Sequence, residues 1–543
     1  MLALGRTASL GASTAAVSFA LAVPSISASA STPALRLATS TKTNVHKQRR
    51  TDVSHQLCNV QKLAQNSMSL RLGRAAPAAV GTGTREQQQT RRHFHHSAVS
   101  DSRYSASTIM TSYCKELTLN DYDIVGFDLD GTLLRYNLRE MSALIYRVLK
   151  QFLVEQKGYK KELLDLPLDV DFLQKGLFLD GPRGNVLKLS NEAQILRAAH
   201  GTRLLSDAEI LEIYGPERKW DVTSAFHKDP LSTWNGAAST QMRSLLDYFD
   251  MPSALVFAQA VDQVDRERKP SPGEEYQVWQ DVQAGLMNIY SREHFANDKS
   301  SYFKSMRAEP ERFILRTDPR VLKWLEELRQ AGKKLFLLTG SNVDFANLTA
   351  TQALGENWRQ HFDFVVTYAK KPGFFTSQRP FMQVDVQKLE ELPTEAAEIR
   401  AGEVYSQGNW HQLHAAMAQL LHKEPTEAKA LYFGDNIVQD VYTPVKHRDF
   451  DAVAIAEELL LEDGKYPYAA ELDSQQWGSY FALDCTPTLW SSFITTYAQL
   501  CVPSVEQVAQ TSPEKRIICT NPYGFSPRLP KELETLHLNS CYR

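Results

Sequence analysis

Two aspartates, Asp128 and Asp130, are separated by one residue and followed by Gly131 and Thr132. Alternation along an extended strand places both side chains on the same side of the chain. Two carboxylates this close repel each other in a dry site unless a cation lies between them, and Mg²⁺ prefers such hard oxygen ligands. A turn at the end of a strand is the simpler interpretation, because Asp-Gly is a common turn pair. The motif alone therefore favours metal-dependent chemistry without deciding for it.

Three further polar segments could belong to the same site. Thr339-Gly340-Ser341 offers hydroxyl and backbone N–H donors to an anion. Lys370-Lys371 offers positive charge, and the segment 434–440 adds the carboxylates Asp435 and Asp440. Taken singly, these segments also fit a helix N-cap, a solvent-exposed basic pair and a capping turn. Because all of them follow apolar runs in this order, one common functional site is the better interpretation.

Short apolar runs precede these segments and have the length of strands. Most of their residues are apolar on both faces, which is typical of buried parallel strands. Between the runs, residues 318–330 place Val321, Leu322, Leu325 and Leu328 at helical spacing. Alternating strands and helices predict an α/β fold, a Rossmann-like doubly wound parallel sheet whose ligands lie at the carboxyl ends of the strands. The predicted strands are residues 124–128, 334–339, 362–367, 430–433 and 452–456.

A long interval interrupts this alternation and predicts a large inserted α+β cap module. It contains amphipathic stretches at 142–154 and 252–264, and a hairpin pattern in which 176–180 and 185–189 flank a Gly-Pro-Arg-Gly turn. An insertion of this size is too long for a loop. The expected organisation is an extension over 1–110, a core of 111–140 and 313–460, a cap over 141–312, and a C-terminal extension over 461–543. That last segment should pack on the core, with a loosely structured tail.

Composition excludes several classes of protein. The 543 residues are 43% hydrophobic and 23% charged, with a net charge of −3, so the chain can bury a core and is not a generally basic nucleic-acid binder. Its six cysteines include no CxxC pair, which argues against structural zinc and a disulfide framework and fits a reducing compartment. No apolar run is long enough to span a membrane. The sequence leaves open whether the chain forms homo-oligomers.

The first hundred residues differ from the rest. They carry twelve Lys and Arg against only Asp52 and Glu86, and show no sustained hydrophobic periodicity. This Arg-rich, Ser-rich and acid-poor character predicts a mitochondrial transit segment. Residues 15–30 could instead be read as a secretory signal, and translation from Met110 would leave a cytoplasmic protein. N-terminal sequencing of the mature chain distinguishes these alternatives.

The four polar motifs, taken in their order along the chain, resemble those of a known superfamily. The set DLDGT (128–132), LLTGS (337–341), AKKP (369–372) and YFGDNIVQD (432–440) resembles the haloacid-dehalogenase-like (HAD) phosphohydrolase superfamily, and within it the cytosolic purine 5′-nucleotidase branch. The resemblance runs from about residue 123 to 508. Further stretches with the character of that branch are 126–130, 176–180, 199–202, 248–252, 371–375, 377–381 and 405–409.

The resemblance implies a role for each motif residue. Asp128 would be the nucleophile that forms an aspartyl-phosphate, and Asp130 would be the general acid and base that also offers its backbone carbonyl to Mg²⁺. Asp435 would complete the metal site with Asp128, and Asp440 would support it. The phosphoryl oxygens would be bound by Thr339, Gly340 and Lys371.

The expected activity is Mg²⁺-dependent removal of phosphate from nucleoside 5′-monophosphates, with no nucleic-acid or membrane partner. Two alternatives stay open: a regulatory HAD-like protein that binds a nucleotide or a partner, and a phosphatase for another small phosphomonoester. Substrate choice should lie in the cap, where the conceivable contacts are Arg197, His200, Arg243 and Phe249. For these four residues a purely structural role is the stronger interpretation.

Overall fold

The computed structural model describes residues 115–541 apart from 234–236, 269, 272, 463–473, 520, 522 and 527–528. The chain divides into two compact units, and all the described residues belong to the unit that contains residues 104–543. The predicted targeting extension over 1–110 lies outside the described residues. None of the described helices is long and apolar enough to cross a membrane.

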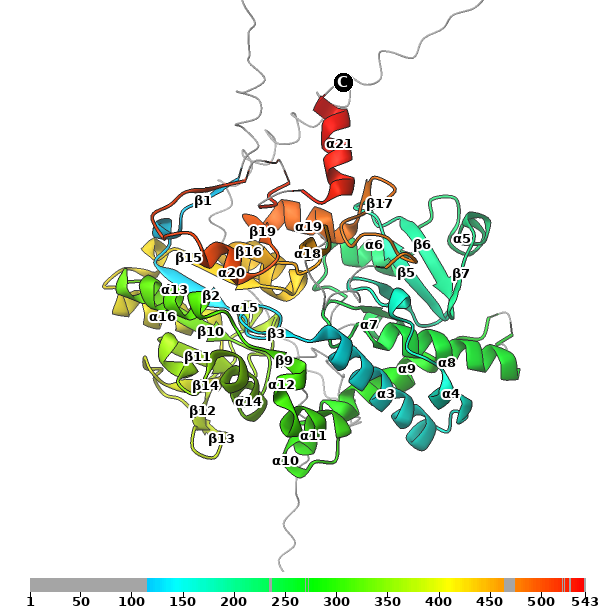
Figure 1. The fold of residues 1–543 in the computed structure, drawn as a ribbon, viewed down its shortest axis with the longest axis horizontal. Coiled ribbons are helices and arrows are strands. Elements are labelled where there is room, and N and C mark those ends of the chain that lie inside the picture. The colour runs from blue at the N-terminus through cyan, green and yellow to red at the C-terminus, as the bar shows by residue number, and fades with distance from the viewer. Residues whose placement is uncertain are drawn as a thin grey trace, which may run out of the picture. The chain divides into compact units, whose positions relative to one another are not determined.

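A nine-stranded sheet forms the centre of the fold (Figure 1). The strands from β14 to β19 in this order are parallel, whereas β12 pairs antiparallel with both β13 and β14. The strands, in sheet order, are β13 (Glu390–Glu395), β12 (Phe381–Asp385), β14 (Val404–Gln407), β11 (Phe364–Thr367), β10 (Lys334–Leu338), β2 (Ile124–Phe127), β15 (Ala430–Gly434), β16 (Asp451–Ile455) and β19 (Leu500–Val502).

Side chains alternate between the two faces of this sheet, and helices cover both. Val125 and Phe127 of β2 pack in the apolar cluster that contains Trp324 of α13 (Pro319–Gln330). Ile124 packs in a different cluster with Trp410 of α16 (Trp410–Leu420). The predicted doubly wound parallel sheet is therefore confirmed, because a strand with apolar residues on both faces needs a helix layer on each side. Other core helices are α14 (Val343–Leu354), α15 (Gly373–Thr376), α17 (Thr443–Arg448), α18 (Leu459–Glu462), α19 (Leu489–Tyr497) and α20 (Val505–Ala509).

The five predicted strands are β2, β10, β11, β15 and β16, and they lie next to one another in the sheet. The sequence pattern did not predict the strands at either edge. β13 is polar and largely exposed, and β19 has only three residues, so neither carries a strong apolar signal. Edge pairing of this kind depends on a neighbouring strand rather than on local sequence.

The residues between β3 (Arg135–Tyr136) and β9 (Ile314–Leu315) form the inserted module, which has its own antiparallel sheet. Its strands are β7 (Arg203–Leu204), β6 (Ile195–His200), β5 (Asn185–Leu189), β4 (Phe178–Asp180) and β8 (Met242–Ser244). The predicted hairpin is β4 and β5, and the two predicted helices lie within α3 (Leu138–Lys157) and α8 (Ser253–Arg268). The remaining helices are α4 (Glu162–Asp165), α5 (Asp207–Tyr214), α6 (Asp221–Lys228), α7 (Ala238–Gln241), α9 (Val278–Ile289), α10 (Arg292–Asn297), α11 (Ser301–Ala308) and α12 (Pro310–Phe313).

The C-terminal segment contacts both parts. β19 extends the main sheet beside β16, and Trp490 of α19 donates its indole N–H to the Gly176 carbonyl at 2.7 Å. Trp490 also stacks on Phe178 of β4, with ring centroids 5.5 Å apart. The segment thus joins the central sheet to the inserted one. Short pairings elsewhere are β1 (Glu116–Leu117) with β20 (Ile517–Ile518) and β17 (Ala482–Leu483) with β18 (Thr486–Pro487), and α21 spans Lys531–Cys541.

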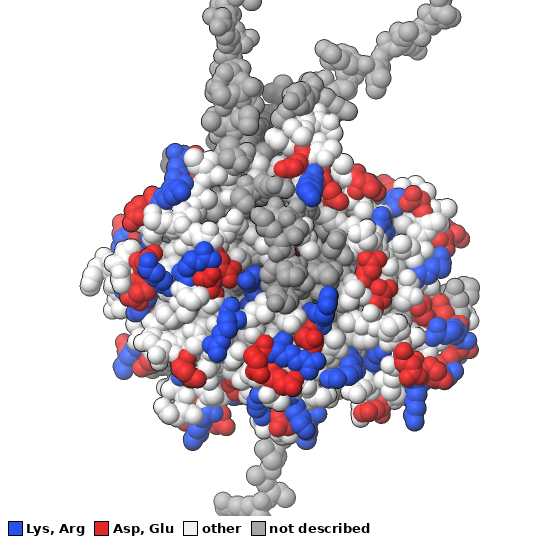
Figure 2. Space-filling model, in the orientation of Figure 1, with Lys and Arg blue, Asp and Glu red and all other residues white. Residues whose placement is uncertain are grey.

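Acidic and basic side chains are interspersed over the face of the molecule seen in Figure 2. Several form exposed ion pairs, such as Arg312 with Glu140 at 2.7 Å and Arg307 with Asp298 at 2.9 Å. Exposed pairs of this kind contribute little to stability. Four buried charged groups, Asp128, Lys371, Asp435 and Asp440, follow the carboxyl ends of central strands.

Candidate active site

The four polar motifs meet at one edge of the central sheet. Asp128 directly follows β2, Thr339 follows β10, Lys371 lies four residues beyond β11, and Asp435 directly follows β15. These four strands are parallel neighbours, so their carboxyl ends coincide. The Asp128 N–H donates to the Phe433 carbonyl at 2.9 Å, which continues the pairing of β2 with β15 into the site. Sheet topology therefore gathers residues that are more than 300 positions apart.

Three buried carboxylates form an acidic group. One oxygen each from Asp128, Asp435 and Asp440 lies within 4.8 Å of the others. Asp440 reaches this position because the segment Ile437–Tyr442 forms a short π-helical turn, a feature frequent at functional sites. The Asn436 N–H donates to Asp440 Oδ2 at 3.2 Å and fixes that carboxylate. Gly434 is required here, since a Cβ at this position would lie 2.2 Å from the Cβ of Asp440.

Lys371 lies between two of these carboxylates. Its Nζ is 2.9 Å from Asp128 Oδ1 and 2.7 Å from Asp440 Oδ1, and both side chains of the second pair are buried. Burial disfavours the charged ammonium, but Asp128 and Asp440 outweigh it and raise the pKa of Lys371 above its usual value. The ammonium is consequently a fixed positive charge directly beside the Asp128 carboxylate.

Asp130 is not part of the acidic group, and three hydroxyls donate to its carboxylate. Tyr136 donates to its Oδ1 at 2.6 Å, and Ser341 and Thr339 donate to its Oδ2 at 2.8 and 3.2 Å. Burial, followed by the charge of Asp128, raises the pKa of Asp130, and these hydrogen bonds only partly offset the rise. A carboxyl with this environment can hold a proton or release one.

The acidic group fits a divalent cation. Among the described residues, Lys371 supplies the one ammonium within ion-pair distance of these three buried carboxylates, so negative charge is in excess within the group. No described residue donates a hydrogen bond to the carboxylate of Asp435. Burial raises the pKa of Asp435 well above its usual range, with Asp128 and Asp440 adding to the rise and Lys175 opposing it. Oxygen ligands at this spacing match the preference of Mg²⁺, and a bound cation would remove the repulsion.

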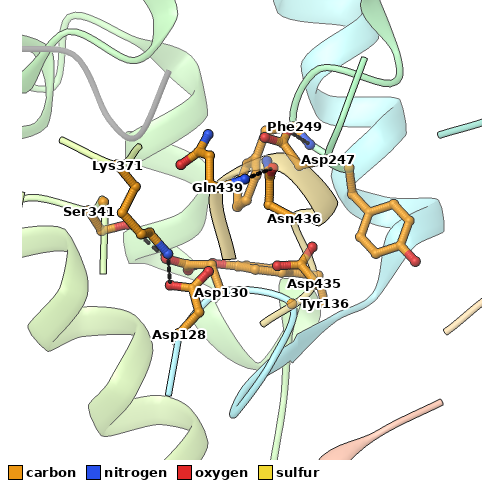
Figure 3. A pocket seen from close by; sticks show the side chains of 13 residues that line it. Asp128, Asp130, Tyr136, Asp247, Phe249, Ser341, Lys371, Asp435, Asn436 and Gln439 are labelled. Atoms are coloured by element: carbon orange, nitrogen blue, oxygen red, sulfur yellow. Dashed lines mark hydrogen bonds and ion pairs between the residues drawn. The ribbon is translucent and has the colours of Figure 1, made fainter. Parts of the chain in front are cut away.

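These residues open onto a pocket (Figure 3). Of the residues predicted from the sequence, Asp128, Asp130, Gly340, Lys371 and Asp435 line it. Two others lie beside it: Thr339 is fully buried with its hydroxyl on Asp130, and Asp440 lies behind Lys371. The structure thus brings all seven predicted residues together. The remaining residues of the lining are Gly131, Tyr136, Asp247, Tyr248, Phe249, Ser341, Asn436 and Gln439.

Sequence reasoning missed Tyr136 and Asp247. Tyr136 lies in β3, and Asp247 lies just after β8 in the inserted module. Neither belongs to a recognisable motif, so their polar groups gave no signal. The sequence offers the Ser341 hydroxyl as a donor to an anion, and the structure adds its hydrogen bond to Asp130.

Of the four conceivable cap contacts, Phe249 alone lines the pocket. Arg243 donates to Asp250 at 2.9 Å, and Arg197 donates to the Gln476 carbonyl. His200 lies between Asn185 at 2.8 Å and Asp265 at 3.0 Å. The structural interpretation that the sequence favoured for these polar residues agrees with their contacts.

The sequence of this chain is similar to those of known proteins over most of its length. Residues 112–466 match the 5' nucleotidase family. Human 5'-nucleotidase domain-containing protein 1 is 36% identical over 425 residues, which cover 72% of this chain and 90% of the human protein. The bovine protein of the same name is 33% identical over 429 residues, with the same coverage. Human 5'-nucleotidase domain-containing protein 2 is 25% identical over 350 residues, covering 63% of this chain and 62% of that protein.

Proposed function

The chain belongs to the 5' nucleotidase family, and we propose that it is a Mg²⁺-dependent phosphohydrolase that removes phosphate from nucleoside 5′-monophosphates through an aspartyl-phosphate at Asp128. One observation carries the proposal. Lys371 Nζ lies 2.9 Å from Asp128 Oδ1, in a buried acidic group that can hold a cation. A phosphate dianion repels an anionic nucleophile, and this arrangement offsets that repulsion at the attacking oxygen.

The first step forms and breaks one bond to phosphorus. Asp128 attacks the phosphate ester, and the bond between phosphorus and the leaving ribose oxygen breaks as the aspartyl-phosphate forms. Asp130 gives its proton to that oxygen, so a nucleoside leaves as a neutral alcohol. The three hydroxyls on Asp130 fix its orientation, and they can accept as well as donate when it is protonated.

The second step returns the enzyme to its starting state. Asp130, now a carboxylate, removes a proton from water, and the resulting hydroxide displaces Asp128 from phosphorus. Inorganic phosphate leaves and Asp130 is again protonated. Lys371 and the backbone at Gly340 would bind the phosphoryl oxygens throughout. Asp128, Asp435 and the Asp130 carbonyl would hold the cation, with Asp440 supporting them, and the cation would supply charge neutralisation at the phosphoryl group.

A nucleoside is the best candidate for the leaving group. The names of the similar human and bovine proteins contain 5'-nucleotidase, and the same pocket that holds the catalytic residues includes the aromatic ring of Phe249. Phe249 contacts Tyr136 and Tyr290 edge-on, at centroid distances of 5.3 and 6.2 Å. An aromatic wall supports a substrate with a planar base.

A phosphate-release assay on nucleoside 5′-monophosphates and on simple sugar phosphates, with Mg²⁺ and with EDTA, tests the proposal. We expect Mg²⁺-dependent release from at least one nucleotide by the wild type. Asp128→Asn should stay folded, by circular dichroism and thermal midpoint, and release none. Undiminished release by this variant contradicts the assigned nucleophile. Nucleotide binding without phosphate release supports a regulatory protein instead. Release from sugar phosphates alone supports a phosphatase for another small phosphomonoester.

A further inference from the structure

Asp247 is a carboxylate in the pocket that the proposed catalytic steps do not use. It comes from the inserted module, three residues after β8 and before α8, and lines the pocket with Phe249. Figure 3 shows these two residues on one side of the view, with Lys371 and Ser341 on the other. The charge of Asp247 acts on Asp435. Asp247 therefore lines the same pocket as Asp128 and Asp435, but enters it from the inserted module.

The orientation of this carboxylate is fixed by the backbone. Oδ1 accepts hydrogen bonds from the N–H groups of Phe249 at 3.1 Å and Asp250 at 3.0 Å. No described residue donates to Oδ2. The charge of Arg243 acts on Asp247, but the guanidinium donates to Asp250 Oδ2, through Nε at 2.9 Å and through Nη2 at 2.5 Å. Oδ1 of Asp247 thus accepts the backbone hydrogen bonds of a turn, and Oδ2 is available to accept from a ligand.

A carboxylate oxygen in a confined pocket requires a hydrogen-bond donor, since leaving it without one is costly. The proposed substrate offers donors in a definite order outward from phosphorus: first the ribose hydroxyls, then the base. Because Asp247 lies near Asp435, the sugar is the part of the nucleotide within its reach. We propose that Asp247 accepts hydrogen bonds from the ribose hydroxyls and makes the enzyme selective for ribonucleotides. This inference rests on the proposed function.

This role has a measurable consequence. A site that hydrogen-bonds a substrate hydroxyl discriminates against the analogue that lacks it, because the protein group is then left without a partner. A hydrogen bond to a charged group changes the rate constant by about 10- to 100-fold. The wild type should prefer a ribonucleoside 5′-monophosphate over its 2′-deoxy or 3′-deoxy analogue by this factor in kcat/KM.

The experiment compares three substrates with the same base on the full-length protein: the ribo, 2′-deoxy and 3′-deoxy nucleoside 5′-monophosphates. Asp247→Asn keeps the oxygen that accepts from the turn and removes the charge, and Asp247→Ala removes the whole group. Both variants should lose about 10- to 100-fold in kcat/KM on the ribonucleotide and little on the analogue lacking the recognised hydroxyl. The Mg²⁺ concentration for half-maximal activity should stay unchanged.

Asp262→Asn is the matched control. Asp262 is also a carboxylate of the inserted module, but it accepts from Thr202 at 2.6 Å and does not line the pocket. This variant should keep the wild-type preference. Equal losses on all three substrates in the Asp247 variants, or a shift in their Mg²⁺ requirement, overturn the inference while leaving the proposed function intact. A wild type that hydrolyses no nucleotide overturns both.

Discussion

Lys371 and Lys370 are adjacent in the sequence but lie in different surroundings. Lys371 bridges Asp128 and Asp440, whereas Lys370 is half-buried with its ammonium 4.6 Å from the ring centre of Tyr368. Lys371→Ala should lower kcat by about 10²–10³, the usual cost of one group that stabilises transition-state charge. Lys370→Ala is the matched control and should keep most of the activity. Steady-state kinetics at saturating Mg²⁺ measure both, and equal losses would contradict the special position of Lys371.

Glu457 is a buried acid whose carboxylate accepts no hydrogen bond within the described part of the chain. Its nearest cation is Arg135, at 3.7 Å. Burial raises the pKa of Glu457 from 4.5 to about 7, with Arg135 opposing the rise and Glu458 adding to it. Between pH 4.5 and about 7 the folded state therefore binds a proton that the unfolded state has released. The resulting stabilisation is complete below pH 4.5 and is lost as the pH rises through about 7.

Glu457→Gln should remove this pH dependence. Between pH 5 and 8 the free energy of unfolding of the wild type should fall by about 2–3 kcal/mol more than that of the variant. Urea unfolding of both proteins at the two pH values measures the difference. Glu506→Gln changes the other acid that contacts Arg135, at 3.3 Å, and should keep the wild-type slope. Parallel pH profiles for the wild type and Glu457→Gln would contradict the prediction.

At the scale of elements, the end of β15 and the following π-helical turn act together. The last residue of the strand, Gly434, has no Cβ, and Asp440 packs directly against it. Gly434→Ala would place two Cβ atoms 2.2 Å apart, so the turn must shift and carry Asp440 with it. We expect about a 10²-fold loss of kcat, since small displacements of catalytic groups are that costly. Circular dichroism should show a folded protein. A wild-type kcat would show that activity does not depend on the position of the Asp440 carboxylate.

The elements differ in how far their sequences predict them. β2, β10, β11, β15 and β16 are buried on both faces, so their apolar runs predicted them within about two residues. β14 and β19 carry weak local signals and become strands because β11 and β16 offer parallel partners. The π-helical turn could not be predicted, because it depends on the contact between Asp440 and the strand that precedes it.

At the scale of the whole molecule, a buried ion pair joins the inserted module to the core. Lys175 precedes β4 and Glu458 follows β16; their charged atoms are 3.2 Å apart and their side chains are 2% and 4% exposed. Tyr248 donates to Glu458 at 3.2 Å, and the Lys175 ammonium is 4.6 Å from the centre of the Tyr248 ring. The pair thus lies where the two sheets meet beside the pocket.

Lys175→Met should cost about 3–5 kcal/mol in the free energy of unfolding, because it leaves the Glu458 carboxylate buried without its cation. Adding Glu458→Gln should recover much of that loss, and a double-mutant cycle by urea unfolding measures the coupling. The exposed pair Lys323–Glu327, also 3.2 Å apart, is the matched control. Lys323→Met should cost under about 1 kcal/mol. Additive losses in the buried cycle would show that the pair does not hold the module in place.

The sequence by itself determined the central strands, the inserted module and the seven polar residues at the carboxyl edge of the sheet. It could do so because apolar periodicity is local, and parallel strands bring their carboxyl ends to one edge whatever their order. Tertiary structure alone decided that Asp130 bonds to Tyr136, Thr339 and Ser341, that Lys371 bridges two carboxylates, and that Asp247 enters the pocket from the insert. Such contacts join residues far apart in the chain, so they depend on how the sheets pack together.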